Sequence, residues 1–137
     1  MPALSFNHAM IYSRDLAPSL AFYRELLGFQ LLEEFRAPIG LVYARLKAPQ
    51  GDSTIALHLL ERGQAMQPGA IRLYFEVRNL QAVCKRLAKQ GAQFTKAPKT
   101  MPWGWTHAYL NDPDGHEVSL YWAGTKRMKT SRLRPPE

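Results

Sequence analysis

The chain has 137 residues, of which 46% are hydrophobic, enough for one domain with its own apolar core. Its single cysteine, Cys84, excludes an internal disulfide, and no apolar run approaches the roughly 18 residues that span a bilayer. No N-terminal stretch has the basic start and apolar run of a signal peptide. We therefore expect a cytoplasmic protein without a membrane partner.

The net charge of +7 is concentrated near the C-terminus. Residues 126–137 hold five basic residues against one acidic residue, and so carry four of the seven net positive charges. Short basic ends rich in Ser, Thr and Pro are usually solvated, so we expect a domain over residues 1–125 followed by a basic tail. An arm for nucleic acid or an acidic partner is the alternative. The body lacks a nucleic-acid-binding signature, and no nucleic-acid partner is expected.

The first half of the chain predicts a strand, a helix and three further strands. After a strand at residues 6–12, a helix places its apolar side chains on one face, at Leu16, Leu20, Tyr23 and Leu27. Asp15 can cap the start of this helix, and Gly28 can end it. The three further strands are expected at residues 29–35, 41–47 and 54–60.

The second half repeats this order. A strand at residues 71–77 precedes a helix with an apolar face, on which Cys84 is expected to be buried, and Gly91 ends it. Strands follow near Phe94 and at residues 106–110 and 117–122. The Arg-Asp-Leu at residues 14–16 recurs as Arg-Asn-Leu 64 residues later, which predicts two β-α-β-β-β modules at about residues 4–61 and 70–123. The fold class is therefore α+β with mixed sheets.

A tight turn is predicted between the last two strands. The sequence Asp-Pro-Asp-Gly at residues 112–115 places Pro where φ is near −65° and Gly115 where φ must be positive. Beyond the turn, Glu117, Ser119 and Tyr121 alternate with apolar residues, so they share one face of the strand.

These features together resemble the vicinal oxygen chelate superfamily, which contains glyoxalase I, the bleomycin- and fosfomycin-resistance proteins and the extradiol dioxygenases. The resemblance covers about residues 5 to 123 and rests on NHAMIYSRDLAPSLAFYRELLGF, on the repeat and on DPDGHEVSLYW. It implies two modules whose sheets curl around an open cavity, and a homodimer. Metal-dependent members place one ligand on the first and last strands of each module, where a divalent ion acts as a Lewis acid.

This chain matches that ligand set only at His8. The position expected near Ala56 holds no ligand, and His58 lies one pleat farther along. Arg72 occupies the third position, and a guanidinium has no lone pair to offer a cation. Ser119 stands where the family has glutamate.

A displaced metal site would consist of His8, His58 and Glu117. Two residues along a strand span roughly 6.6 Å, whereas metal bonds tolerate errors of only ~0.2 Å. We therefore expect no cofactor, with a divalent Zn, Mn, Fe or Ni ion as the alternative. The same three residues are the candidate catalytic acid and base groups.

The expected cavity lining is polar and aromatic, and its candidate ligand-binding residues are Arg72, Tyr74, Ser119, Tyr121, Trp103 and Trp105. Arg72 requires an anionic partner, either a ligand or an internal Glu76 or Glu117. The two indoles can stack on a ligand, or they can cap the core or a dimer seam.

Two functions follow from the sequence. The first is a metal-free protein of the bleomycin-resistance kind that binds a small anionic or aromatic molecule. The second is a metal-dependent enzyme of the superfamily: a lyase, dioxygenase, isomerase or thiol transferase. The degraded ligand set favours the binding protein.

Overall fold

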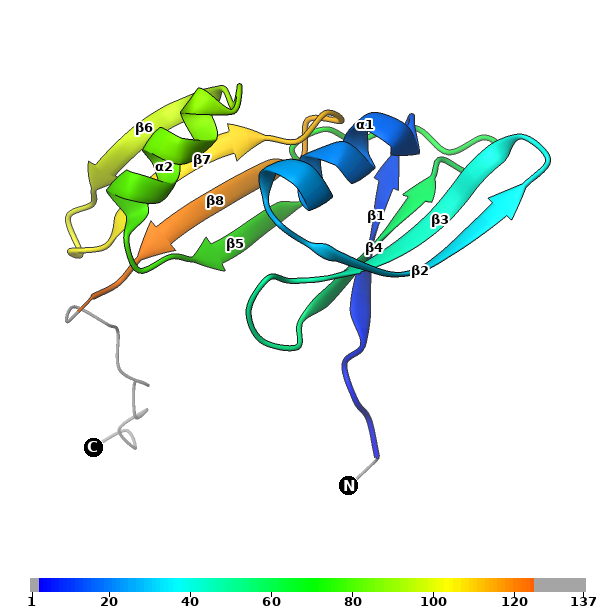
Figure 1. Cartoon of the computed structure of the whole chain (residues 1–137), viewed down its shortest axis with the longest axis horizontal. Coiled ribbons are helices and arrows are strands. Elements are labelled where there is room, and N and C mark those ends of the chain that lie inside the picture. The colour runs from blue at the N-terminus through cyan, green and yellow to red at the C-terminus, as the bar shows by residue number, and fades with distance from the viewer. Residues whose placement is uncertain (1–2, 125–137) are drawn as a thin grey trace, which may run out of the picture. The chain divides into compact units, whose positions relative to one another are not determined.

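The computed structural model describes residues 3–124, which form two four-stranded sheets, each with one helical segment (Figure 1). Within these residues the chain divides into two compact units. One comprises residues 3–72 together with Asn111–Glu117, and the other comprises Leu73–Leu110 together with residues 118–124. The predicted basic tail at residues 126–137 lies outside the described residues.

The first sheet has the strand order β1-β4-β3-β2. Strands β1 and β4 are parallel, whereas β3 is antiparallel to both β2 and β4. The four strands agree with the predicted ones to within one or two residues: β1 (His8–Ser13), β2 (Gln30–Ala37), β3 (Gly40–Lys47) and β4 (Thr54–Leu59).

The predicted first helix consists of two parts, α1 (Leu16–Ala21) and the π-helical turn η1 (Phe22–Leu26). Asp15 caps α1 as predicted, because its carboxylate accepts a hydrogen bond from the Ala17 N–H at 3.1 Å. The wider turn is closed by the Leu27 N–H, which donates to the Phe22 carbonyl at 3.1 Å. Leu16, Ser19 and Tyr23 are buried on the inner side of this segment.

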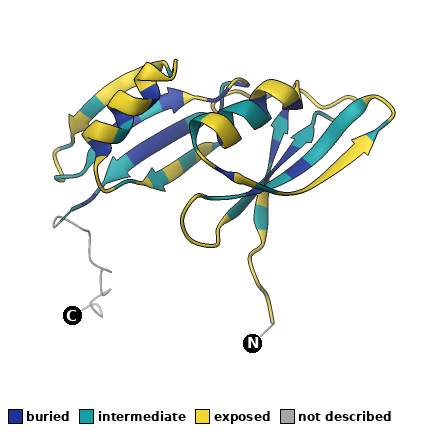
Figure 2. Ribbon diagram, in the orientation of Figure 1, coloured by how far each residue is buried: buried dark blue, intermediate teal, exposed yellow. Residues whose placement is uncertain are grey.

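The second sheet has the strand order β5-β8-β7-β6, and α2 (Leu80–Lys89) lies against it (Figure 1). Leu80, Cys84 and Leu87 form the buried face of α2, and burial raises the pKa of the Cys84 thiol. Figure 2 shows that burial in this sheet is concentrated on β7 and β8. The strands are β5 (Arg72–Glu76), β6 (Phe94–Thr100), β7 (Thr106–Asn111) and β8 (Glu117–Trp122).

Each sheet therefore has one face packed under its helix and one face left for other contacts. In β1, the apolar Ile11 is buried, whereas His8 and Met10, which alternate with it, are only partly covered. No helix within residues 3–124 is long and apolar enough to cross a bilayer.

Candidate functional site

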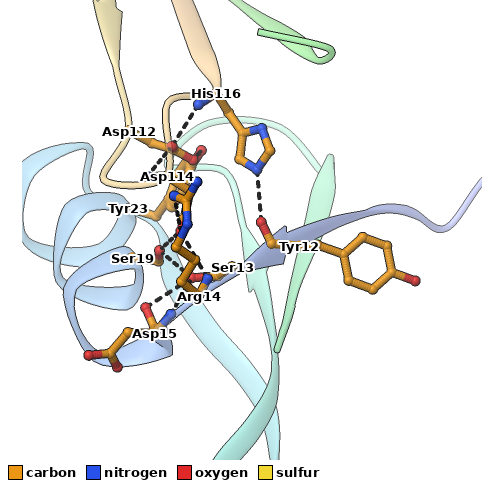
Figure 3. Close-up of polar contacts among 9 residues, drawn as sticks. All are labelled: Tyr12, Ser13, Arg14, Asp15, Ser19, Tyr23, Asp112, Asp114 and His116. Atoms are coloured by element: carbon orange, nitrogen blue, oxygen red, sulfur yellow. Dashed lines mark hydrogen bonds and ion pairs between the residues drawn. The ribbon is translucent and has the colours of Figure 1, made fainter. Parts of the chain in front are cut away.

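The Asp-Pro-Asp-Gly turn forms as predicted, with Gly115 at φ 86°, and Asp112 organises it (Figure 3). The Asp112 Oδ1 accepts hydrogen bonds from the N–H groups of Asp114 and His116, both at 2.9 Å. Its Oδ2 accepts the Tyr23 hydroxyl proton at 2.8 Å. Burial, together with the Asp112 and Asp114 carboxylates, raises the pKa of Tyr23, so this phenol stays protonated and donates.

Asp114 ties the same turn to the start of the first helix. Its Oδ1 accepts the Arg14 N–H at 2.9 Å, and its Oδ2 accepts the Ser19 hydroxyl proton at 2.7 Å. Burial alone would raise the pKa of Asp114, but these hydrogen bonds and the nearby His116 lower it. The His116 Nε2 lies 2.8 Å from the Tyr12 carbonyl oxygen.

The two carboxylates of the turn thus have a structural task that does not depend on a metal. They satisfy buried donors of the first helix and of the turn itself. A buried donor left without its acceptor costs about 1–3 kcal/mol, so the turn sequence is needed for packing. The turn motif therefore has a role in this chain, although the last strand carries Ser119 in place of a ligand.

The register of the first sheet separates His8 from His58. Since His8 pairs with Thr54 and His58 pairs with Tyr12, the two histidines are offset by four residues along the strands. Four residues correspond to roughly 13 Å, which is too far for one ion to bind both. The His58 ring instead packs edge-on against Tyr12, with ring centroids 5.8 Å apart.

Arg72 forms the internal ion pair that the sequence left open. Its Nε donates to the Glu117 Oε2 at 2.6 Å, so the carboxylate of the displaced metal set is bound to a guanidinium. Among residues 3–124, no group of three or more His, Cys, Asp or Glu side chains is placed to hold a metal ion. The donor set of one chain therefore does not fit the divalent ion of the superfamily.

A polar network that the sequence analysis missed covers part of the first sheet. Glu33 Oε1 accepts hydrogen bonds from the Tyr43 hydroxyl and from the Arg45 Nε, both at 2.8 Å. These bonds, led by that from Arg45, lower the pKa of Glu33. Arg45 also donates to Asn7 Oδ1, which lies 2.6 Å from the His8 Nδ1. His8 is thereby joined to an ion pair on its own sheet.

The second sheet carries a set of rings that we call the aromatic array: Trp105, His107, Tyr109 and Tyr121. The planes of Trp105 and Tyr121 are within 12° of parallel, with centroids 5.2 Å apart. The His107 ring is within 6° of parallel to Tyr109 and 21° to Tyr121, at 5.9 and 5.7 Å. Tyr74 packs edge-on against Tyr121, and Trp103 packs edge-on against His107. The rings therefore stand side by side across neighbouring strands.

His107 is the polar member of the array and is only 5% exposed. Its Nδ1 lies 3.4 Å from the Oγ of the fully buried Ser119, and its Nε2 is buried without a hydrogen-bond partner in the described part of the chain. Burial lowers the pKa of His107 below its usual value of 6.5, which favours the neutral imidazole at pH 7.

Five of the six predicted ligand-binding residues meet around this array. Trp105 and Tyr121 are members, whereas Tyr74, Trp103 and Ser119 contact it. The sequence analysis missed His107 and Tyr109, because it considered only the first and last strands of each module. The alternation of side chains along residues 106–111 could have identified them, because it places His107 and Tyr109 on the same face of the strand.

A groove on the first unit lies away from these residues. It has a volume of about 540 Å³ and lies between α1 and the β2–β3 hairpin, with Arg14, Arg24, Arg36 and Ile39 among its lining residues. None of the predicted site residues lines it.

Comparison with known proteins agrees with this architecture. The family model described as the Glyoxalase/Bleomycin resistance protein/Dioxygenase superfamily matches residues 5–120. A probable lactoylglutathione lyase of Synechocystis sp. is 26% identical over 126 residues, covering 88% of this chain and 96% of that protein.

Two solved structures have this fold and are about as similar in sequence to this chain as that lyase is. A superfamily member from Sphaerobacter thermophilus is 28% identical with a TM-score of 0.71, covering 87% of this chain and 98% of its own. TnmS3, an antibiotic binding protein from a Streptomyces species, is 28% identical with a TM-score of 0.70, covering 89% of this chain and 98% of its own. The chain belongs to the Glyoxalase/Bleomycin resistance protein/Dioxygenase superfamily.

Proposed function

We propose that this protein binds a small, planar aromatic molecule on the aromatic array, without a metal ion. The observation that carries the proposal is the set of near-parallel rings formed by Trp105, His107, Tyr109 and Tyr121. Such rings offer a flat ligand further stacking contacts. The antibiotic-binding description of TnmS3 supports a binding role for a protein of this fold.

The charges beside the array favour a ligand with an anionic group. Lys96 and Lys99 lie on β6, in register with Tyr109 and His107 of β7. The Lys96 ammonium lies 5.4 Å from the centre of the Tyr109 ring. A carboxylate or phenolate at the edge of the ligand would meet these two cations.

A suitable test uses 2-naphthoic acid as the probe and tryptophan fluorescence as the readout. For about 13 non-hydrogen atoms at ~0.4 kcal/mol each, we expect saturable quenching with a Kd on the order of 0.1 mM. EDTA should not change this Kd. Absence of saturable quenching, or quenching that EDTA abolishes, would refute the proposal.

The alternative is a metal-dependent enzyme of the superfamily, and the lyase relatives support it. His8, His58 and Glu117 would be its ligands or its acid and base groups. The offset between the two histidines and the ion pair of Glu117 with Arg72 argue against that assembly within one chain. Loss of probe binding on EDTA treatment, with recovery on adding Zn²⁺ or Mn²⁺, would favour the enzyme.

We also propose that the protein is a homodimer. Leu4 and Phe6 precede β1 and are 85% and 87% exposed in the single chain, and a second copy could cover these apolar side chains. Sedimentation at micromolar concentration should give about 31 kDa, twice the 15.6 kDa of one chain, and Phe6→Asp should shift it toward the monomer. A wild-type protein that sediments as a monomer would contradict this proposal.

A further inference from the structure

The buried nitrogen of His107 is the least satisfied group of the aromatic array. The ring is 5% exposed, its Nε2 has no hydrogen-bond partner within residues 3–124, and aromatic side chains surround it. A buried polar atom without a partner is costly, and within residues 3–124 the only other such side-chain atom is His116 Nδ1, in the turn. A ligand stacked on the array could supply the missing partner.

The chemistry of that partner follows from the opposite ring nitrogen. His107 Nδ1 faces the Ser119 hydroxyl, which can either donate or accept a hydrogen bond. If Ser119 donates, Nε2 carries the proton and requires an acceptor; if Ser119 accepts, Nε2 has a lone pair and requires a donor. A ligand hydroxyl satisfies either tautomer.

A ligand can reach Nε2 only when a covering side chain moves. Trp103 is the exposed neighbour: it is 46% exposed, and its ring contacts His107 edge-on at 6.0 Å and 70°. The next residue, Gly104, has a φ of 95°, in the region that favours glycine. Because Trp103 is the most exposed of the described rings that contact His107, it is the side chain whose movement would disturb the array least.

We propose that His107 Nε2 is a specificity-determining hydrogen-bond site that selects planar aromatic ligands with a hydroxyl group on the ring, which take the place of the Trp103 indole. This proposal rests on the proposed function, because the ligand must first stack on the array. The ligands selected in this way are hydroxylated aromatic acids. His107 is not one of the positions at which the superfamily binds its metal.

The test compares 2-naphthoic acid with its 1-hydroxy, 3-hydroxy and 6-hydroxy derivatives, measured by calorimetry. One buried hydrogen bond is worth about a five- to tenfold change in Kd, so at least one isomer should bind wild-type protein that much more tightly than 2-naphthoic acid. In His107→Phe, which retains an aromatic ring, the hydroxyl advantage should disappear: the preferred hydroxy isomer and 2-naphthoic acid should bind this variant with the same Kd.

The matched control is His58→Phe, which removes a histidine from the first sheet and should leave the hydroxyl advantage intact. Because His107→Phe also removes the partner of buried Ser119, a measurement on wild-type protein accompanies it. With ¹⁵N-labelled histidine, the Nε2 signal of His107 should shift much farther with the preferred hydroxy isomer, which bonds to it, than with 2-naphthoic acid, which only stacks beside it.

The outcomes separate the two proposals. If 2-naphthoic acid does not bind, the proposed function fails. If it binds but no hydroxy isomer binds more tightly, or the advantage survives in His107→Phe, the aromatic array remains and the role of His107 is refuted. An unchanged Nε2 signal in the complex with the preferred isomer would refute it as well.

Discussion

Asp112→Ala should lower the free energy of unfolding by about 3–5 kcal/mol, because one substitution removes three buried hydrogen bonds. The carboxylate accepts from the Tyr23 hydroxyl and from two N–H groups of the turn, those of Asp114 and His116. All three hydrogen bonds are buried, so the donors lose their acceptor without gaining water in its place. Urea unfolding followed by circular dichroism measures the loss.

Asp52→Ala is the matched control, since Asp52 is an exposed loop residue and its removal should change stability by less than about 0.5 kcal/mol. Tyr23→Phe removes only one of the three bonds of Asp112, so its effect should be intermediate, about 1–2 kcal/mol. A loss below about 1 kcal/mol in Asp112→Ala would show that the turn does not depend on its carboxylate.

Local patterns were sufficient to predict the fold. Period-two alternation located the strands, and Asp15 and Gly91 marked helix ends where the structure has them. The pattern placed Tyr23 on the apolar face of the first helix but gave no reason for Ser19 to be buried beside it. The partners of Ser19 and Tyr23, Asp114 and Asp112, are 95 and 89 residues away in the sequence.

The candidate site was less predictable because it depends on register. Alternation assigns a residue to a face, but only strand pairing shows that His8 and His58 are four residues apart. The pairing of Glu33 with Arg45 follows an irregular register in β2, between Leu31 and Glu33. A bulge of this kind changes which residues meet across the sheet, and the sequence did not indicate it.

Trp105→Ala should weaken the binding of 2-naphthoic acid by about 10- to 100-fold, the loss expected for removing one stacked ring worth ~1.4–2.8 kcal/mol. Trp105 lies near-parallel to both Tyr121 and His107, so its removal takes away a ring that stacks on two other members of the array. Isothermal titration calorimetry is the appropriate measurement, because the substitution also removes a fluorophore.

Trp103→Ala provides the contrast, since both variants lose an indole from the same loop. Trp103 is exposed and packs edge-on, so the stacking surface survives its removal, and the Kd of 2-naphthoic acid should stay within about threefold of wild type. If the two variants lose affinity equally, the loop contributes general apolar contact, and the near-parallel rings do not form the binding surface. A large loss in Trp105→Ala alone assigns the ligand to the face of the array, because the two indoles differ in ring geometry and not in chemistry.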